Sequence, residues 1–191
     1  TFHPAFRFAG PSRREVGVPT VFNLLGPMAN PGRVRHQVIG VANPAFAERM
    51  LTTLRHHGTT RAWVVHGNGL DELTTTAPST VLALEDGEVR TFEVDPVRLG
   101  FAPAAMGQLV GGNRAHNASV VRRVMAGDRG PHRDIVVLNA AAGLVVAGAA
   151  AGLDEGVALA AASIDEGRAA AALDALVATS QAAAAPATTA S

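Results

Sequence analysis

The stretch from Gly17 to Pro31, GVPTVFNLLGPMANP, restricts the fold of this chain more than any other. Pro19, Pro27 and Pro31 fix the backbone φ angle around a short apolar segment, so the stretch cannot form one uninterrupted helix. Gly26 carries no side chain beside Pro27, which allows another group to approach the main chain closely. The residues alone leave two interpretations open, a tightly packed turn or the wall of a binding slot.

The composition is that of a globular protein. The chain has 191 residues, of which 48% are hydrophobic and 17% are charged, and this is enough to bury a sizeable core. Its formal net charge of +0 lacks the basic excess that is typical of nucleic-acid-binding proteins. The absence of cysteine excludes disulfides and thiolate metal sites, and no stretch of the sequence resembles a secretory leader. We therefore expect a cytoplasmic protein that binds neither nucleic acid nor a membrane.

One uncharged run, from Ile135 to Leu153, is long enough to be compared with a membrane span. Asn139 and the many Ala and Gly residues in it favour a helix that is buried on most sides of a water-soluble domain. We expect Asp134 to cap this helix, because its carboxylate can accept hydrogen bonds from the free N–H groups of the first turn.

The pattern of apolar residues predicts alternating strands and helices. Apolar residues at helical spacing follow Pro44, and helices are predicted from Asn113 onward. Asp86 and Gly87 are the two-residue signature of a type I′ hairpin between the last two strands. Residues 182–191 have no periodicity and nothing to bury, which predicts a disordered tail. The four predicted strands are residues 37–41, 61–66, 80–85 and 88–94.

Several motifs, in order, resemble one enzyme family. The stretch HPAFRFAGPSRREVGVPTVFNLLGPMANP, residues 3–31, resembles the centre of an anthranilate phosphoribosyltransferase. GLDELTT, residues 69–75, is similar to the second acidic signature of that family, and the spacing between the two motifs fits. The similarity continues through GGNRAHNA (residues 111–118) and RDIVVLNAAAGLVVAG (residues 133–148) to the helical end near Val177. It therefore spans nearly the whole chain.

The resemblance implies the C-terminal part of the large α/β domain of a nucleoside phosphorylase or phosphoribosyltransferase-type fold, with a mixed sheet flanked by helices. In that family a glycine-rich GTGGD loop and a KHGN segment hold the diphosphate of phosphoribosyl pyrophosphate (PRPP), and both precede the HPA motif. We therefore expect residues 1–181 to form a partial α/β domain that is inactive by itself. The resemblance also implies that the full-length enzyme is a homodimer, joined through a helical domain.

Asp71 and Glu72 are the candidate metal ligands. They are adjacent carboxylates between a predicted buried strand and a Thr-rich run, and hard oxygen ligands of this kind hold Mg²⁺ bridged to substrate phosphates. The residues alone are more typical of an ordinary acidic loop that caps a helix. The resemblance implies that this pair carries Mg²⁺ to the diphosphate.

The candidate substrate slot lies in the first 31 residues. A guanidinium presents a planar fork of donors that matches a carboxylate, although an Arg pair is also typical of a charged surface. The resemblance implies that Arg13 contacts the anthranilate carboxylate, and that His3, Pro4, Gly26 and Pro27 line the slot.

The function that the resemblance implies is transfer of a phosphoribosyl group from PRPP to the nitrogen of anthranilate, the second step of tryptophan biosynthesis from chorismate. Phe6 and Gly10 depart from the residues that are commoner in the family at these positions, so the detailed shape of the slot is not implied. One alternative is a pyrimidine-nucleoside phosphorylase, which shares the fold and uses phosphate as its acceptor. The other is a non-catalytic member of the fold that binds nucleic acid or a partner, for which a basic surface cluster is predicted.

Overall fold

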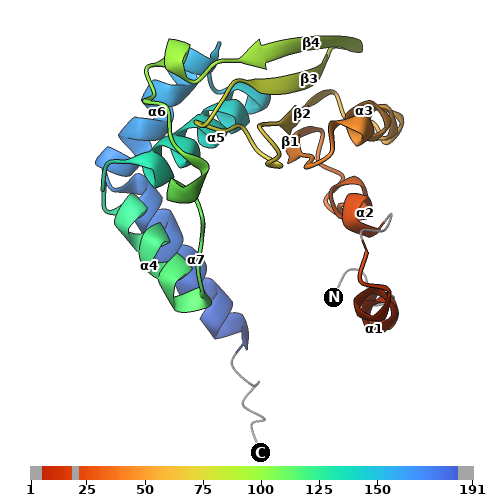
Figure 1. The fold of residues 1–191 in the computed structure, drawn as a ribbon, viewed down its shortest axis with the longest axis horizontal. Coiled ribbons are helices and arrows are strands. Elements are labelled where there is room, and N and C mark those ends of the chain that lie inside the picture. The colour runs from red at the N-terminus through yellow and green to blue at the C-terminus, as the bar shows by residue number, and fades with distance from the viewer. Residues whose placement is uncertain (1–5, 19–21, 185–191) are drawn as a thin grey trace, which may run out of the picture. The chain divides into compact units, whose positions relative to one another are not determined.

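The computed structural model describes residues 6–18 and 22–184 (Figure 1). The contacts divide the chain into two compact units. The first runs up to Glu72 and includes Ser79–Val94, and the second consists of Leu73–Pro78 and the residues from Asp95 onward. The expectation of one partial domain over residues 1–181 stays a prediction.

The first unit is built on a mixed four-stranded sheet with the order β1-β2-β3-β4. β1 and β2 are parallel, whereas β2 and β3, and β3 and β4, are antiparallel. This confirms the α/β class and the mixed sheet expected from the sequence, and it confirms all four predicted strands to within a residue at each end. The elements of this unit are α1 (Phe6–Val16), α2 (Phe22–Met28), β1 (His36–Gly40), a 3₁₀ turn (Pro44–Phe46), α3 (Ala47–His56), β2 (Arg61–His66), β3 (Ser79–Glu85) and β4 (Glu88–Val94).

The 3₁₀ turn and α3 connect the parallel strands β1 and β2, as a parallel pairing requires. The side chain of Asn43 accepts a hydrogen bond from the Ala45 N–H at 3.0 Å, which caps the start of the 3₁₀ turn. The apolar face of α3, including Met50 and Leu54, is buried in one cluster with Val64 of β2. This cluster is the core of the unit, and Figure 1 shows α3 beside β1 and β2.

β3 and β4 form the predicted hairpin. Asp86 and Gly87 have φ angles of 51° and 88°, the left-handed pair that a type I′ turn requires. Trp63 is 2% exposed, which confirms that it belongs to the core, and its ring meets Phe92 edge to face with centroids 5.3 Å apart.

The second unit is helical in its described part. Val124 and Val137 are buried with Ala160 and Ile164 in a cluster that joins α4, α5 and α6. Its elements are two 3₁₀ turns (Val97–Leu99 and Met106–Gln108), α4 (Arg114–Met125), α5 (Pro131–Ala147), α6 (Leu153–Asp165) and α7 (Arg168–Ala184).

The start of α5 corrects one prediction. The helix begins at Pro131 with Gly130 at the N-cap position, so Asp134 lies within the first turn and does not cap it. Proline is favoured at the first helical position because its missing N–H needs no partner there, and this moves the start upstream of Asp134. The helix ends at Ala147, well before Leu153.

Two other expectations bear on the C-terminal half. No helix in residues 6–18 or 22–184 combines the length and the apolar character needed to cross a bilayer. α7 continues to Ala184, so residues 182–184 are helical and are not part of a disordered tail. Residues 185–191 lie outside the described residues.

Candidate functional site

The acidic pair follows a tight turn at the end of β2. The N–H of Gly67 donates to the Leu70 carbonyl at 3.1 Å, and the N–H of Leu70 donates to the Gly67 carbonyl at 2.8 Å. Asp71 and Glu72 come directly after this turn. They therefore lie at the carboxyl end of the parallel pair β1–β2, the end at which open α/β sheets bind ligands.

The main chain of the acidic loop lies against the last residue of β1. A side chain on Gly40 would overlap the backbone carbonyl of Asp71, so only glycine fits at this point of the strand. Beside it, Nδ1 of His66 lies 2.8 Å from the carbonyl oxygen of Val41. Because a carbonyl oxygen only accepts, this nitrogen is the protonated one of the ring. These contacts fix the path of the chain into the acidic pair.

The two carboxylates differ in their surroundings. Asp71 is exposed, whereas Glu72 is half-buried. Burial, and secondly the negative charge of Asp71, raise the pKa of Glu72 above its ordinary value. Within the described residues, no group of three or more His, Cys, Asp or Glu side chains gathers as a metal cluster. Among the described residues, Asp71 and Glu72 are the adjacent carboxylates that this loop offers to a cation.

The residue after the acidic pair is held by a side chain that the sequence did not single out. Leu73 is fully buried, its N–H donates to Oδ1 of Asn139 at 2.9 Å, and its carbonyl accepts from Nδ2 of Asn139 at 2.7 Å. In the sequence, Asn139 served only as an argument against a membrane span. A lone amide within the apolar run of α5 was the available signal, because a buried amide needs hydrogen-bond partners.

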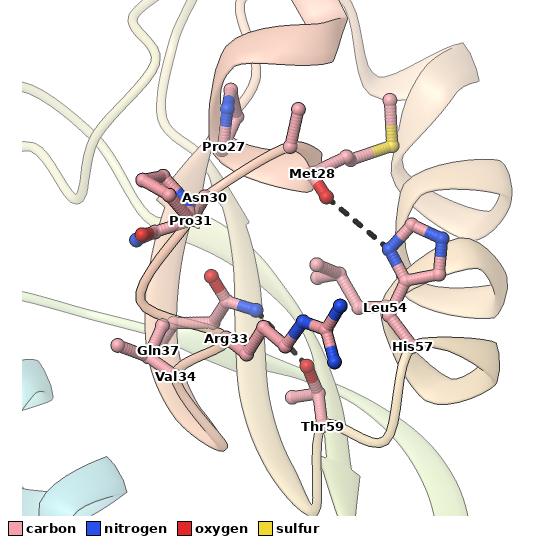
Figure 2. Close-up of a pocket in the computed structure, with 11 residues that line it drawn as sticks. Pro27, Met28, Asn30, Pro31, Arg33, Val34, Gln37, Leu54, His57 and Thr59 are labelled. Carbon is pink, nitrogen blue, oxygen red and sulfur yellow. Dashed lines mark hydrogen bonds between the residues drawn. The ribbon is translucent and has the colours of Figure 1, made fainter. Parts of the chain in front are cut away.

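A cavity of about 480 Å³ lies elsewhere in the first unit (Figure 2). Its lining comes from the end of α2 and the segment that follows it, from β1, and from the end of α3 and the residues just after it. Two hydrogen bonds shape its wall. Nδ1 of His57 lies 3.2 Å from the Met28 carbonyl, and Nε2 of Gln37 donates to Oγ1 of Thr59 at 3.1 Å. Pro27 and Arg33 also line it.

The cavity and the acidic pair lie at opposite ends of the parallel strands. Gln37 and Thr59 of the cavity are at the amino end of β1 and just before β2, whereas Asp71 contacts Gly40 at the carboxyl end of β1. Gly40 lies three positions after Gln37 in the strand, which corresponds to about 10 Å. The structure thus does not bring the cavity beside Pro27 together with the acidic pair.

The remaining predicted site residues are described only in part. His3 and Pro4 lie outside the described residues, and so does the side chain of Arg13, whose backbone is in α1. Gly26 lies in α2, and no described atom outside its own helix would come within 4 Å of a side chain built on it. The sequence left two interpretations open for this stretch, a tightly packed turn or the wall of a binding slot. The described residues provide no packing partner for Gly26.

Comparison with known proteins identifies relatives of this chain. An anthranilate phosphoribosyltransferase of Methylobacterium nodulans is 53% identical over 183 residues, covering 95% of this chain and 54% of the relative. One from Agrobacterium fabrum is 48% identical over 181 residues, covering 95% of this chain and 53% of the relative. The chain thus spans about half the length of these relatives.

Solved structures agree with the sequence comparison. Anthranilate phosphoribosyltransferase from Thermus thermophilus matches with a TM-score of 0.84 and 40% identity, over 92% of this chain and 52% of that one. The Saccharomyces cerevisiae enzyme in complex with PRPP and Mg matches with a TM-score of 0.76 and 25% identity, over 87% of this chain and 48% of that one. The model of the glycosyl transferase family, a/b domain, matches residues 1–170. With its mixed sheet and flanking helices, the chain belongs to this glycosyl transferase family.

Proposed function

We propose that this chain provides the α/β part of an anthranilate phosphoribosyltransferase, a pentosyltransferase of tryptophan biosynthesis. The relatives that carry this name match the chain over most of its length. The observation that carries the proposal is the position of Asp71 and Glu72 at the carboxyl end of the parallel strands, directly after the turn at Gly67–Leu70. This is where a substrate with a metal-bound diphosphate would bind in a fold of this kind.

Asp71 and Glu72 fit a magnesium ion that is shared with a substrate. Mg²⁺ usually takes one or two protein carboxylates and completes its shell with water and substrate phosphates. The adjacent carboxylates supply that number, and burial together with the negative charge of Asp71 raises the pKa of Glu72, which a nearby cation would offset. When bound, the cation offsets the negative charge that develops on the departing diphosphate.

The acceptor slot of this proposal is formed by His3, Pro4, Arg13, Gly26 and Pro27. Arg13 pairs with the carboxylate of anthranilate through its planar fork of donors, and the other four residues bound the aromatic ring. Among the described residues, no atom outside α2 would come within 4 Å of a side chain at Gly26, which supports the approach of a planar ligand there.

The reaction is a displacement at C1 of the ribose. The bond from the anthranilate nitrogen to C1 forms, the bond from C1 to the pyrophosphate oxygen breaks, and a proton leaves the nitrogen to water. The arylamine is a neutral nucleophile at pH 7, so no side chain has to act as a strong general base. The chain's residues contribute by holding both substrates in line, which removes the entropic cost of their encounter from the chemical step.

We further propose that the complete enzyme is a cytoplasmic homodimer, joined through a helical domain, that binds neither nucleic acid nor a membrane. The formal net charge of +0 supports the absence of nucleic-acid binding, and the exposed Phe8, Val16 and Val18 at α1 support an apolar contact there. Light scattering on the joined enzyme described next measures the assembly state.

The test joins the N-terminal part of the Methylobacterium nodulans relative to Thr1 of this chain. We expect the joined enzyme to consume anthranilate only when PRPP and Mg²⁺ are both present, and to be inactive in thymidine phosphorolysis. The 191-residue chain alone should form no product, because it spans 54% of that relative. A soluble, folded joined enzyme that never consumes anthranilate would overturn the proposed function.

A further inference from the structure

The side chain of Asn139 binds both main-chain groups of one residue. Its Oδ1 accepts from the N–H of Leu73 at 2.9 Å, and its Nδ2 donates to the carbonyl of Leu73 at 2.7 Å and to the carbonyl of Ile135 at 2.9 Å. The orientation of the amide is unambiguous, because the two carbonyls can only accept and the N–H can only donate. The side chain therefore makes a two-point contact with Leu73, like the pairing between residues of neighbouring strands.

Few side chains could replace this contact. Leu73 is 0% exposed, so its N–H and carbonyl have no access to water and need partners within the protein. A single planar group that offers one acceptor and one donor side by side is a carboxamide, and only Asn and Gln carry one. The third hydrogen bond, to the carbonyl of Ile135 one turn earlier in α5, holds the Asn139 side chain in the rotamer that faces Leu73.

The contact lies next to the acidic pair. Leu73 directly follows Glu72, and two residues before it the Asp71 backbone lies against Gly40. Within the first unit the Asp71 main chain lies against Gly40, and within the second unit the Asn139 side chain binds the main chain of Leu73. Asp71 and Leu73 are the chain neighbours of Glu72, so these contacts restrict the main chain on either side of its carboxylate.

We infer that Asn139 is a positioning residue for the acidic pair, which acts through Leu73 and touches neither substrate nor metal. This inference rests on the proposed function for its consequence in catalysis. Groups that orient metal ligands from behind typically change metal affinity by about 10- to 100-fold when they are removed. Loss of the Asn139 contact should therefore act on the use of Mg²⁺ and PRPP, and much less on anthranilate.

The first part of the test does not depend on catalysis. Hydrogen exchange of the joined enzyme is compared with that of its Asn139→Ala and Val146→Ala variants. Val146 is matched because it is also buried in α5 and makes no hydrogen bond to Leu73 through its side chain. We expect the segment 70–76 to exchange at least tenfold faster in Asn139→Ala, whereas Val146→Ala should leave it unchanged. Equal exchange of this segment in both variants would overturn the inference.

The second part measures kinetics in the same three proteins and in the variant Asn139→Gln. Asn139→Ala should raise the KM for PRPP and the Mg²⁺ concentration for half-maximal rate by about tenfold, with less than a twofold change in the KM for anthranilate. Asn139→Gln, which keeps the carboxamide, should recover part of the loss. If Asn139→Ala lowers only thermal stability, as Val146→Ala does, the residue has no positioning role. Failure of the proposed function is distinct from this outcome, because the unmodified joined enzyme would then be inactive.

Discussion

The main chain of Gly40 lies so close to the carbonyl oxygen of Asp71 that a Cβ atom at Gly40 would overlap this oxygen. The last residue of β1 thereby sets the position of the loop that carries both candidate metal ligands. A small residue at the end of a strand is usually attributed to a bend or bulge, but here the reason is contact with the acidic loop.

Replacement of Gly40 by Ala should displace this loop. We expect a loss of about 1–3 kcal/mol in the free energy of unfolding, which is typical of overpacking. In the joined enzyme, the rate should also respond less strongly to added Mg²⁺. Gly143→Ala is the matched control, since a Cβ there meets nothing within 4 Å and the residue lies inside α5. That control should be stabilised by roughly 0.5–1 kcal/mol. Equal unfolding midpoints for Gly40→Ala and the unmodified protein would contradict the close contact.

The metal role of the acidic pair is tested by removing charge without changing size. The double variant Asp71→Asn, Glu72→Gln of the joined enzyme should retain its fold and lose Mg²⁺-dependent turnover by orders of magnitude. Titration of the rate with Mg²⁺, with circular dichroism as the check on folding, measures this. Retention of the original Mg²⁺ dependence would return the pair to an ordinary acidic loop.

The raised pKa of Glu72 predicts how stability depends on pH. The protonated form is favoured in the folded state, so its contribution is present below pH 4.5, the group's ordinary pKa, and is lost as the pH rises through the higher folded value. Glu72→Gln should therefore be more stable than the unmodified chain at pH 7 in metal-free buffer, and this advantage should disappear below pH 4.5. Thermal unfolding between pH 4 and 8 tests this, with the exposed Glu93→Gln as the control. A stability gain that is the same at every pH would refute the assignment.

Arg13 tests the acceptor slot. Arg13→Ala in the joined enzyme removes a charge-assisted pair with anthranilate, which is worth about 1.5–3 kcal/mol, or ten- to a hundredfold in KM for anthranilate. The KM for PRPP should change far less, and Arg13→Lys should rescue poorly because a point charge cannot reproduce the fork. Arg14→Ala is the control and should have the smaller effect. If both Ala variants keep the original KM for anthranilate, the slot lies elsewhere.

The buried Arg133 makes a separate prediction about stability. It is 3% exposed and donates two hydrogen bonds to Asp165, at 3.1 and 3.0 Å. Asp165→Asn should cost about 2–3 kcal/mol, less than for a fully buried pair because the Asp165 side chain is 40% exposed. Arg129→Ala, which removes the other, 75% exposed partner of Asp165, should cost less than about 1 kcal/mol. Urea denaturation of the chain measures both. Similar costs for the two variants would mean that burial of Arg133 is energetically unimportant.

Local signals in the sequence were sufficient for much of the fold. The hairpin at Asp86–Gly87 and the helix after Asn43 depend on neighbouring residues, so their turn and capping preferences are visible in the chain itself. The start of α5 was predicted wrongly because Asp134 and Pro131 both carry start signals, and the proline dominates.

The candidate site was less accessible to this kind of reasoning. Asp71 and Glu72 were found through a resemblance, but Asn139 was not, since it lies 66 residues from Leu73 in the chain. The cavity in Figure 2 was missed for a similar reason, because Pro27, Gln37 and Thr59 come together only when β1 pairs with β2. Contacts of this range follow from strand register, which single-residue preferences do not determine.

The division of the chain has a practical consequence for dissecting the protein. The backbone leaves the first unit after Glu72, re-enters it at Ser79 and leaves it again after Val94. No single cut can therefore liberate either unit intact. A truncated version that starts at Asp95 would lack Leu73, and the Asn139 carboxamide would lose two of its three bonds. A fragment based on the second unit should therefore keep Leu73–Pro78 and join it to Asp95 through a short linker that replaces Ser79–Val94.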